Sequence, residues 1–203
     1  GILSKKVLMI DLDPQGNATT GVGINKGDVE NSIYEVLIGQ AVIEDAIIKT
    51  KYKNMSIVPA YTNLAGIDIV FINKERKAVA DGEVFDKTGQ LKKSILKIKD
   101  NYDYIIIDCP PSLGVLTTNA LAASSVIIPV QCEFFALEGV MQLMNTIMLA
   151  KKKINPNLEI EGVLLTMLYS RTNLGLEVVE NIRGFFKERV YDTIIPRLVR
   201  LSE

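Results

Sequence analysis

The chain has 203 residues, of which 48% are apolar and 23% charged, and these proportions are typical of a soluble globular protein with a substantial core. Its 23 basic and 24 acidic residues leave a net charge of −1, so any contact with nucleic acid would have to come from a local basic patch. The absence of histidine excludes Ser-His-Asp and Cys-His catalytic groups and every metal site that needs histidine, and the lack of a long apolar run argues against a membrane span.

The first predicted element is a buried strand over residues 7–10, where four apolar residues run into a loop that starts at Asp11. Ser32 is predicted to cap a short helix that ends before Gly39. Up to residue 60 the pattern predicts a helix over 33–38, a second helix over 42–48 and a strand over 55–59.

The rest of the chain alternates strands and helices more regularly. Residues 102–108 form the strongest predicted strand, an apolar run that ends at Asp108. A polar stretch with two glycines, residues 81–89, predicts a loop or hairpin insertion. The remaining predicted elements are helices over 63–77, 91–99, 112–121, 136–153 and 174–189 and strands over 125–130, 162–168 and 193–196.

The order of these elements predicts the fold class. Helical segments lie between most of the six predicted strands, and no Asn-Gly hairpin turn joins any of them. This order indicates an α/β fold of the doubly wound type, with a largely parallel sheet flanked by helices. No repeat or linker divides the chain, so a single domain over residues 1–203 is expected.

Carboxylates follow two of the predicted strands. Asp11 and Asp13 come at the end of the first strand, and Asp108 ends the strand over 102–108. Because open α/β sheets bind ligands at the carboxyl ends of their strands, we expect these side chains at one edge of the sheet. Mg²⁺ prefers such oxygen ligands, and a carboxylate there could orient a water molecule for attack on a phosphoryl group. Any one of these aspartates alone could equally cap a helix, and residues 14–17 alone could form an ordinary loop.

Four sequence blocks resemble those of the ParA/Soj family of chromosome and plasmid partition ATPases. They are D-L-D-P-Q-G-N from Asp11, I-D-C-P-P-S-L-G from Ile107, P-V-Q-C-E from Pro129 followed by A-L-E-G from Ala136, and R-T-N-L-G from Arg171. Two further stretches, I-P-R from Ile195 and V-R-L-S-E from Val199, resemble the next block of that family. The resemblance spans nearly the whole chain in the family's order.

The resemblance implies a P-loop ATPase with a deviant Walker motif that binds ATP and Mg²⁺. It also implies that the ATP-bound protein is a homodimer, binds DNA without sequence preference and is stimulated by a centromere-binding partner of the ParB/Spo0J type. Such a protein is expected in the cytoplasm, on the nucleoid, without a membrane partner. Cys109 and Cys132 have no CxxC spacing and are expected to be inert thiols in a reducing compartment.

The resemblance further implies roles for individual residues. Asp13 matches the catalytic aspartate that sets up the attacking water, and Asp108 matches the Walker B aspartate, which acts on Mg²⁺ through a water molecule. The implied nucleotide-binding residues are Asp11, Asn17, Met167 and Pro196, and the implied DNA-binding residues are Arg171, Arg197 and Arg200.

Three features depart from the family pattern. The lysine-rich P-loop, K-G-G-V-G-K-T, belongs before the strand that ends at Asp11 and does not occur in the 203 residues. The chain is therefore expected to be truncated at both ends relative to the family, to lack a central strand and to be inactive in ATP hydrolysis. Leu198 replaces a usual asparagine, which predicts weaker recognition of adenine, and the stretch 81–89 is longer than the family's usual connection.

Several other functions fit parts of the sequence. A MinD-like ATPase that cycles on membranes would need a C-terminal amphipathic helix. A metabolic enzyme of the same superfamily, such as a CobQ-type amidotransferase or a biotin-pathway ligase, is disfavoured by the block at Arg171. A non-catalytic relative without a P-loop would bind DNA or a protein partner without ATP. By composition alone, the basic residues near the C-terminus would form a solvated helix face.

Overall fold

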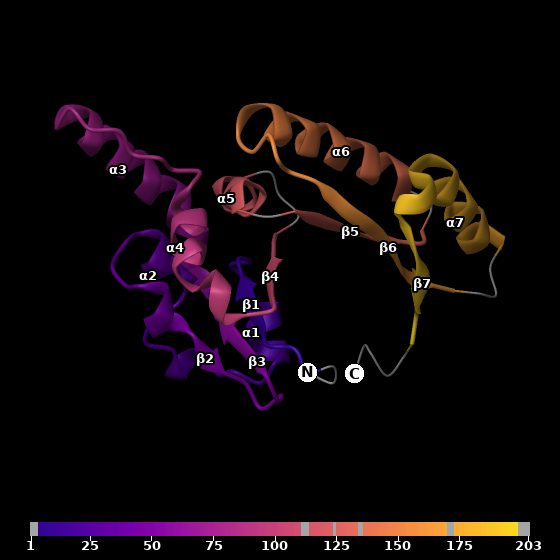
Figure 1. The fold of residues 1–203 in the computed structure, drawn as a ribbon, viewed down its shortest axis with the longest axis horizontal. Helices are drawn as coiled ribbons and strands as arrows, with labels where there is room; N and C mark the ends of the chain where they lie inside the picture. The colour runs from indigo at the N-terminus through magenta and orange to yellow at the C-terminus, as the bar shows by residue number, and fades with distance from the viewer. Residues whose placement is uncertain (1–3, 111–113, 124, 134–135, 170–172, 199–203) are drawn as a thin grey trace. The chain divides into compact units, whose positions relative to one another are not determined.

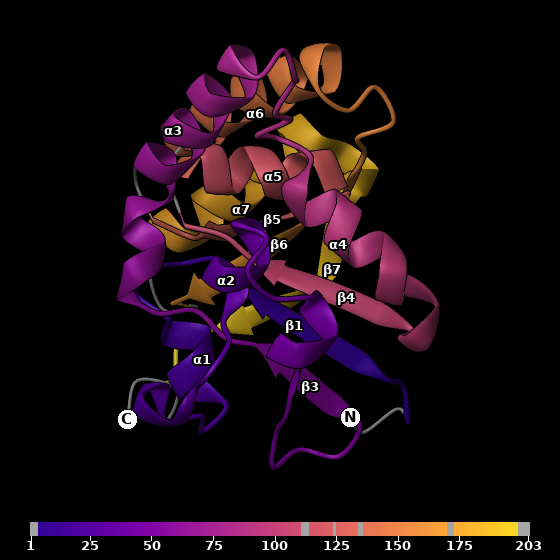
Figure 2. The ribbon, with the colours of Figure 1, turned by 90° about the vertical axis from the view of Figure 1, so that its left-hand side faces the viewer.

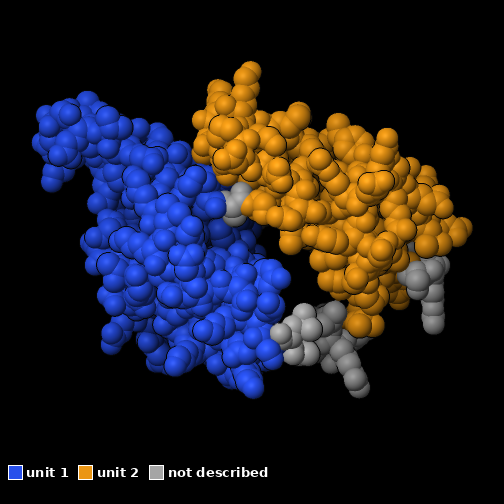
Figure 3. Space-filling model, viewed as in Figure 1, with its two compact units in different colours: residues 1–123 blue, residues 124–203 orange. Residues whose placement is uncertain are grey.

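A computed structural model of the chain describes residues 4–110, 114–123, 125–133, 136–169 and 173–198. The chain divides into two compact units, residues 1–123 and residues 124–203 (Figure 3). Each unit has a β-sheet of its own with helices packed against it (Figure 1). This architecture confirms the α/β class, while the single domain over residues 1–203 stays a prediction.

The first unit contains four strands and five α-helices within its described residues, joined by four short 3₁₀ helices. The strands are β1 (Val7–Asp11), β2 (Ile48–Lys49), β3 (Met55–Val58) and β4 (Tyr104–Asp108). The α-helices are α1 (Asn17–Gly21), α2 (Ile33–Leu37), α3 (Ile67–Ala80), α4 (Gln90–Ile98) and α5 (Val115–Ala123). The 3₁₀ helices are η1 (Lys26–Asp28), η2 (Ile43–Ala46), η3 (Thr62–Gly66) and η4 (Lys99–Asn101).

The sheet of the first unit has the strand order β2-β3-β1-β4. Strand β1 pairs in parallel with β3 on one side and with β4 on the other (Figure 2). This arrangement brings the carboxyl ends of β1 and β4, which are far apart in the sequence, to the same edge.

The prediction of a helix over residues 42–48 is wrong. A 3₁₀ helix, η2, occupies only Ile43–Ala46, and the chain then enters β2, which pairs antiparallel with β3. The hydroxyl of Thr50 donates to the carbonyl oxygen of Met55 at 2.9 Å and fixes the turn between these two strands. A short apolar run is compatible with either a helix or a strand. Here residues 48 and 49 form a strand because the edge of β3 is available to pair with them.

The core of the first unit lies on one face of its sheet. Leu8 and Ile10 of β1 are fully buried there against side chains of α2, α3 and α4. On the opposite face, Tyr104 and Ile106 of β4 remain 58% and 51% exposed. The apolar run of β4 predicts burial on both faces, but the described helices of this unit cover only one of them well.

Local capping sets the start of α2, as Ser32 predicts. The Ser32 hydroxyl accepts a hydrogen bond from the Tyr34 amide at 3.1 Å, and a carboxylate oxygen of Glu35 accepts one from the Ser32 amide at 2.8 Å. These reciprocal bonds form a capping box and satisfy amides that a helix start leaves without partners.

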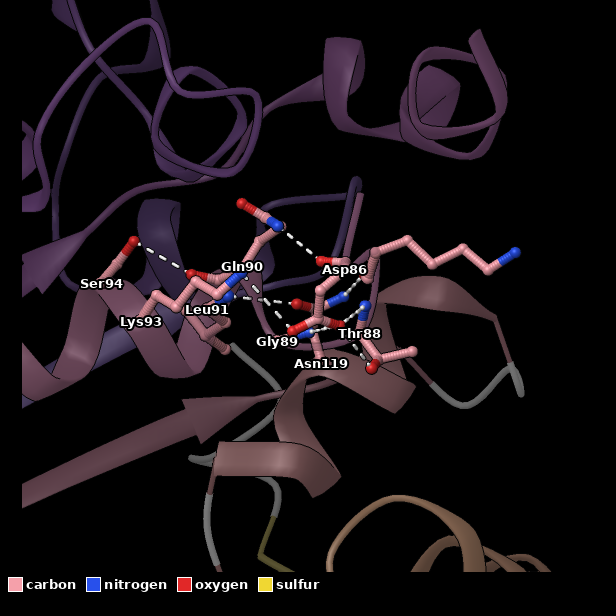
Figure 4. Close-up of polar contacts among 9 residues, drawn as sticks. Asp86, Thr88, Gly89, Gln90, Leu91, Lys93, Ser94 and Asn119 are labelled. Carbon is pink, nitrogen blue, oxygen red and sulfur yellow. Dashed lines mark hydrogen bonds and ion pairs between the residues drawn. The ribbon is translucent and has the colours of Figure 1, made fainter. Parts of the chain in front are cut away.

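The insertion at residues 81–89 is a loop that leads directly into α4 (Figure 4). Asp86 accepts hydrogen bonds from the amides of Thr88 and Gly89, and these bonds shape the turn before the helix. Asn119 of α5, which is fully buried, accepts a bond from the Leu91 amide at 3.1 Å and donates one to the Lys87 carbonyl oxygen at 2.8 Å. One side chain therefore anchors both the insertion and the first turn of α4.

The second unit has a parallel sheet with the strand order β5-β6-β7. Its core contains Ile128, Val163 and Leu165 from the strands and Ile182 from a helix, all of them buried. The elements of this unit are β5 (Val126–Gln131), α6 (Ala136–Lys153), β6 (Ile160–Leu168), α7 (Asn173–Phe186), the 3₁₀ helix η5 (Lys187–Arg189) and β7 (Val190–Pro196).

Candidate functional site

Asp11 is the buried end of β1, with no exposed surface. Its Oδ1 accepts a hydrogen bond from the Asp13 amide at 3.0 Å. Its Oδ2 accepts two bonds from Thr19, one from the amide at 2.8 Å and one from the hydroxyl at 2.7 Å. Since a buried carboxylate is costly unless its oxygens are hydrogen-bonded, these three donors explain how a core strand can end in an aspartate.

The loop after β1 is a tight turn that starts at Asp13. The Gln15 amide donates to Asp13 Oδ1 at 2.9 Å, and the Gly16 amide donates to the Asp13 carbonyl oxygen at 2.8 Å. Gly16 has a φ of 61°, and a Cβ atom there would lie 2.6 Å from the Ala60 carbonyl oxygen, so only glycine fits without strain. The ammonium of Lys26 donates to the Gln15 carbonyl oxygen and ties the turn to η1. Asp13 itself is half-buried.

Asp108 lies beside Asp11. In the parallel register of β1 and β4 these two residues are partners, and the Leu12 amide donates to the Asp108 carbonyl oxygen at 2.8 Å. Partial burial, together with the negative charges of Asp11 and Asp13, raises the pKa of the Asp108 carboxyl. The three aspartates that the sequence placed at one sheet edge are therefore close enough to interact electrostatically.

The edge formed by these aspartates fits Mg²⁺. Among the residues the structure describes, no group of three or more acidic or cysteine side chains is arranged so that these side chains alone could hold a metal ion. Mg²⁺ does not need such a cage, because it commonly binds one or two carboxylates and fills its other positions with water and phosphate oxygens. A cation here would also relieve the repulsion that raises the pKa of Asp108.

The same carboxylates affect a neighbouring thiol. Burial and the charge of Asp108 raise the pKa of Cys109 from 9.0 to about 12. Cys132 is also buried, and burial raises the pKa of its thiol as well. Both cysteines are free thiols, and their inert character stays a prediction.

The remaining predicted nucleotide-binding residues lie at two places. Asn17 begins α1 in the first unit, where it is exposed. Met167 and Pro196 belong to the second unit, near the carboxyl ends of β6 and β7, where Leu168 and Pro196 are register partners. Met167 has a φ of 56°, a conformation that is uncommon for a residue other than glycine. Only Met167 and Pro196 therefore lie at strand ends, and the roles of all three residues stay predictions.

Of the three predicted DNA-binding residues, the structure describes only Arg197; Arg171 and Arg200 lie outside the described residues. The Arg197 guanidinium is 3.6 Å from a carboxylate oxygen of Glu133, and both side chains are more than half exposed. Such an exposed ion pair is weak, so a phosphate could replace Glu133 as the partner of Arg197. Leu198 is 51% exposed.

Thr19 and Lys26 are parts of the site that the motifs did not indicate. Thr19 could have been found by asking which nearby hydroxyl satisfies a carboxylate at the end of a core strand, because it lies only eight residues after Asp11. The bond from Lys26 to the Gln15 carbonyl oxygen has no comparable signal, since lysines on short helices are usually solvated.

None of the helices in the described ranges combines the length and the apolar character needed to cross a membrane.

Comparison with known sequences gives matches along nearly the whole chain. A family model described as an AAA domain matches residues 2–160. The sporulation initiation inhibitor protein Soj of Bacillus subtilis (strain 168) is 52% identical over 202 residues, which cover 99% of this chain and 76% of that protein. The chromosome partitioning protein ParA of Myxococcus xanthus (strain DK1622) is 44% identical and covers 98% of this chain, which spans 67% of that protein. The chromosome-partitioning ATPase Soj of Treponema pallidum (strain Nichols) is 41% identical, and the match covers 100% of this chain and 75% of that protein.

Comparison with solved structures gives the same fold. The cobyrinic acid a,c-diamide synthase of Mycobacterium smegmatis, crystallised with ADP and magnesium, has a TM-score of 0.85 and 34% identity over 97% of this chain and 76% of that chain. A plasmid partition protein from Borrelia burgdorferi has a TM-score of 0.75 and 27% identity, and the match covers 98% of this chain and 81% of that chain. These likenesses extend over far more of the chain than the motifs do.

Proposed function

This chain belongs to the ParA/Soj family of chromosome-partitioning ATPases. We therefore propose that its three converging aspartates form the part of an ATP-hydrolysing site that binds hydrated Mg²⁺ and positions the attacking water. The observation that carries this proposal is the register that pairs Asp11 with Asp108 and starts the Asp13 turn at the same sheet edge. When bound, ATP would supply the electrophilic γ-phosphorus, and Mg²⁺ would neutralise negative charge on the phosphate oxygens.

Asp13 is the residue that we assign to the attacking water. Its Oδ1 is held by the Gln15 amide, and no hydrogen bond from any described residue reaches its Oδ2. That oxygen is available to orient a water molecule and accept its proton. Asp108 is assigned to the hydration shell of Mg²⁺, where a cation would lower the pKa that partial burial and the acidic neighbours raise.

The nucleotide contacts are assigned on the family resemblance. It supports direct contacts for Asn17, Met167 and Pro196. For Asp11, the three hydrogen bonds to the protein's own groups favour an indirect contribution, through the shape of the loop, over a direct contact.

A test of the catalytic assignment uses ATP turnover by the natural full-length protein. Substitution of Asp13 by alanine should abolish turnover, and substitution of Asp108 by alanine should raise the Mg²⁺ concentration that turnover requires. Asp100→Ala is the matched control, because Asp100 is an exposed aspartate on η4. Turnover by the Asp13 variant at the rate of the unchanged protein would refute the assignment.

Residues 1–203 alone, without a K-G-G-V-G-K-T sequence, should not hydrolyse ATP, because no lysine-rich loop is present to cradle the phosphates. The measurement is phosphate release by this polypeptide in the presence of DNA and a ParB-type partner. Phosphate release that disappears in the Asp13→Ala variant would contradict this expectation.

We also propose that the full protein binds DNA without sequence preference through Arg171, Arg197 and Arg200. The family resemblance and the exposed, weakly paired guanidinium of Arg197 support this assignment. Substitution of Arg197 by alanine should weaken binding to unrelated DNA sequences equally and should reduce the salt dependence of binding. Glu133→Ala, which removes the competing carboxylate, should not weaken binding.

The family resemblance further supports an ATP-dependent homodimer on the nucleoid and stimulation by a ParB/Spo0J-type partner. Sedimentation with and without ATP tests the dimer, and turnover with added partner tests the stimulation. A metabolic ligase is the second candidate, because a solved structure with 34% identity is a cobyrinic acid a,c-diamide synthase. The 52% identity to Soj favours partition, and amide formation on a cobyrinic acid substrate would reverse that choice.

A further inference from the structure

A buried chain of hydrogen bonds links the end of β3 to the loop that carries Asp13. The Ala60 amide donates to the Thr19 hydroxyl at 3.0 Å, and that hydroxyl donates to Asp11 Oδ2 at 2.7 Å. Asp11 Oδ1 then accepts the bond from the Asp13 amide at 3.0 Å. Thr19 and Asp11 have no exposed surface, so water cannot replace either partner.

The Thr19 hydroxyl has only one orientation that satisfies this chain. A hydroxyl has one proton to donate, and here that proton goes to the Asp11 carboxylate while the oxygen accepts from Ala60. The Thr19 amide adds a second bond to the same Asp11 oxygen. The carboxylate of Asp11 is therefore held in one rotamer, with Oδ1 aimed at the Asp13 amide.

We propose that Thr19 is a positioning residue, which sets the catalytic Asp13 through Asp11 and the backbone of the turn. This inference rests on the proposed function, because it requires that Asp13 act on the attacking water. Thr19 does not touch substrate in this proposal. Its effect comes from the geometry of the turn, where displacement of a catalytic group by about 1 Å can cost on the order of a hundredfold in rate.

The test compares three substitutions of Thr19 in the natural full-length protein. Valine keeps the shape and removes the hydroxyl, serine keeps the hydroxyl, and cysteine offers only a weak donor of similar size. Thr20→Val is the matched control, because Thr20 is exposed and its hydroxyl, among the described residues, bonds only the carbonyl oxygens of Gly16 and Asn17 within its own turn. Rates are expressed per native molecule, with the native fraction taken from unfolding curves in the same buffer.

We expect Thr19→Val to lower kcat for ATP about tenfold or more and to leave KM within about twofold. Thr19→Ser should recover most of the rate, and Thr20→Val should match the unchanged protein. Hydrogen exchange of the Asp13 amide should accelerate in Thr19→Val and not in Thr20→Val, because the acceptor Oδ1 is no longer held in place. If Thr19→Val does not fold, Thr19→Cys should turn over at least threefold more slowly than Thr19→Ser.

Normal kcat in Thr19→Val, or equal rates for the cysteine and serine variants, would overturn the positioning role. A normal exchange rate of the Asp13 amide in a folded Thr19→Val protein would do the same. Asp13→Ala is assayed in parallel to separate this proposal from the one on which it rests. If Asp13→Ala is inactive and Thr19→Val is fully active, only the positioning role fails. If Asp13→Ala retains full activity, both proposals fail.

Discussion

Gly16 shows how closely the backbone is packed around the site. Its replacement by alanine would place a Cβ atom 2.6 Å from the Ala60 carbonyl oxygen at a φ of 61°. The left-handed conformation alone costs about 1–2 kcal/mol. We expect Gly16→Ala to lower Tm by about 2–8 °C from the conformation alone, and by more with the steric overlap, since 1 kcal/mol corresponds to about 2–4 °C in a chain of this length.

The control for this prediction is Gly21→Ala. Gly21 ends α1, and a Cβ atom there would have no neighbour within 4 Å. Its Tm should change little. Thermal unfolding followed by circular dichroism measures both variants, and equal Tm values would show that the turn tolerates a side chain.

Cys109 reports the electrostatics of the aspartate edge. Burial and the charge of Asp108 raise its pKa from 9.0 to about 12, so its thiol should react with iodoacetamide at pH 8 about 10²–10³-fold more slowly in the native protein than in urea. Asp108→Asn should speed the native reaction because it removes one cause of the shift. The measurement is mass spectrometry of a Cys132→Ala protein, in which Cys109 is the only thiol.

The direction of the pH effect on stability follows from the same shift. Between pH 9 and pH 12 the unfolded thiol loses its proton before the folded one, so the free energy of unfolding should fall as pH rises through this window. Asp108→Asn should reduce the part of this fall that comes from Cys109. Labelling of Cys109 at the rate of an exposed thiol would contradict the burial on which both expectations depend.

Among the elements, α4 depends on a side chain from another helix. Asn119→Ala leaves the Leu91 amide and the Lys87 carbonyl oxygen without the partner that they have in Figure 4. We expect a loss of about 1–3 kcal/mol in the free energy of unfolding, because a buried amide and a partly buried carbonyl oxygen lose their hydrogen bonds. Urea unfolding measures the loss, and hydrogen exchange of the Leu91 amide should accelerate.

Ser94→Ala is the control for Asn119→Ala. The Ser94 hydroxyl bonds the Gln90 carbonyl oxygen within α4, a bond that competes with the helix and adds little to its stability. Its substitution should change the free energy of unfolding by no more than about 0.5 kcal/mol. If Ser94→Ala costs as much as Asn119→Ala, the anchoring by α5 is not what holds the start of α4.

The sequence predicted helices and strands well where a local signal, such as an apolar run or a capping residue, was clear. The apolar run of β4, the cap at Ser32 and the strand end at Asp11 all lie where residue pattern and turn chemistry put them. The helix expected over 42–48 failed because residues 48 and 49 pair with β3, a contact that no local pattern contains. Thr19 was missed because no motif contains it, although a search for the hydroxyl that satisfies the Asp11 carboxylate eight residues earlier would have found it. Its second partner, Ala60, lies 41 residues away in the sequence.

At the scale of the molecule, the first unit has an apolar sheet face that its described helices leave partly open. Ile106 on this face is 51% exposed, whereas Ile107, next to it in β4, packs against the core. We expect Ile106→Ala to cost about 1 kcal/mol or less, and Ile107→Ala about 2–3 kcal/mol. Urea unfolding of the two variants of residues 1–203 makes the comparison.

The exposed side chain of Ile106 should also affect the surface properties of the protein. Contiguous exposed apolar side chains bind hydrophobic dyes and promote association. Ile106→Lys should therefore reduce both dye fluorescence and light scattering of residues 1–203 at equal protein concentration. Unchanged scattering in this variant would show that the open face of β4 does not drive association.

The hydrogen bonds around Asp11 also suggest an order of folding. The bond between Thr19 and Asp11 closes a loop of eight residues, whereas the bond from the Lys6 amide to Asp103, which accompanies the pairing of β1 and β4, closes one of 97 residues. Short loops lose less chain entropy on closing, so the turn around Asp13 can form early, and Asp108 reaches its place only when β4 docks. A partly folded chain would therefore have the turn around Asp13 before Asp108 lies beside it, so the proposed Mg²⁺ site could form only after β4 docks.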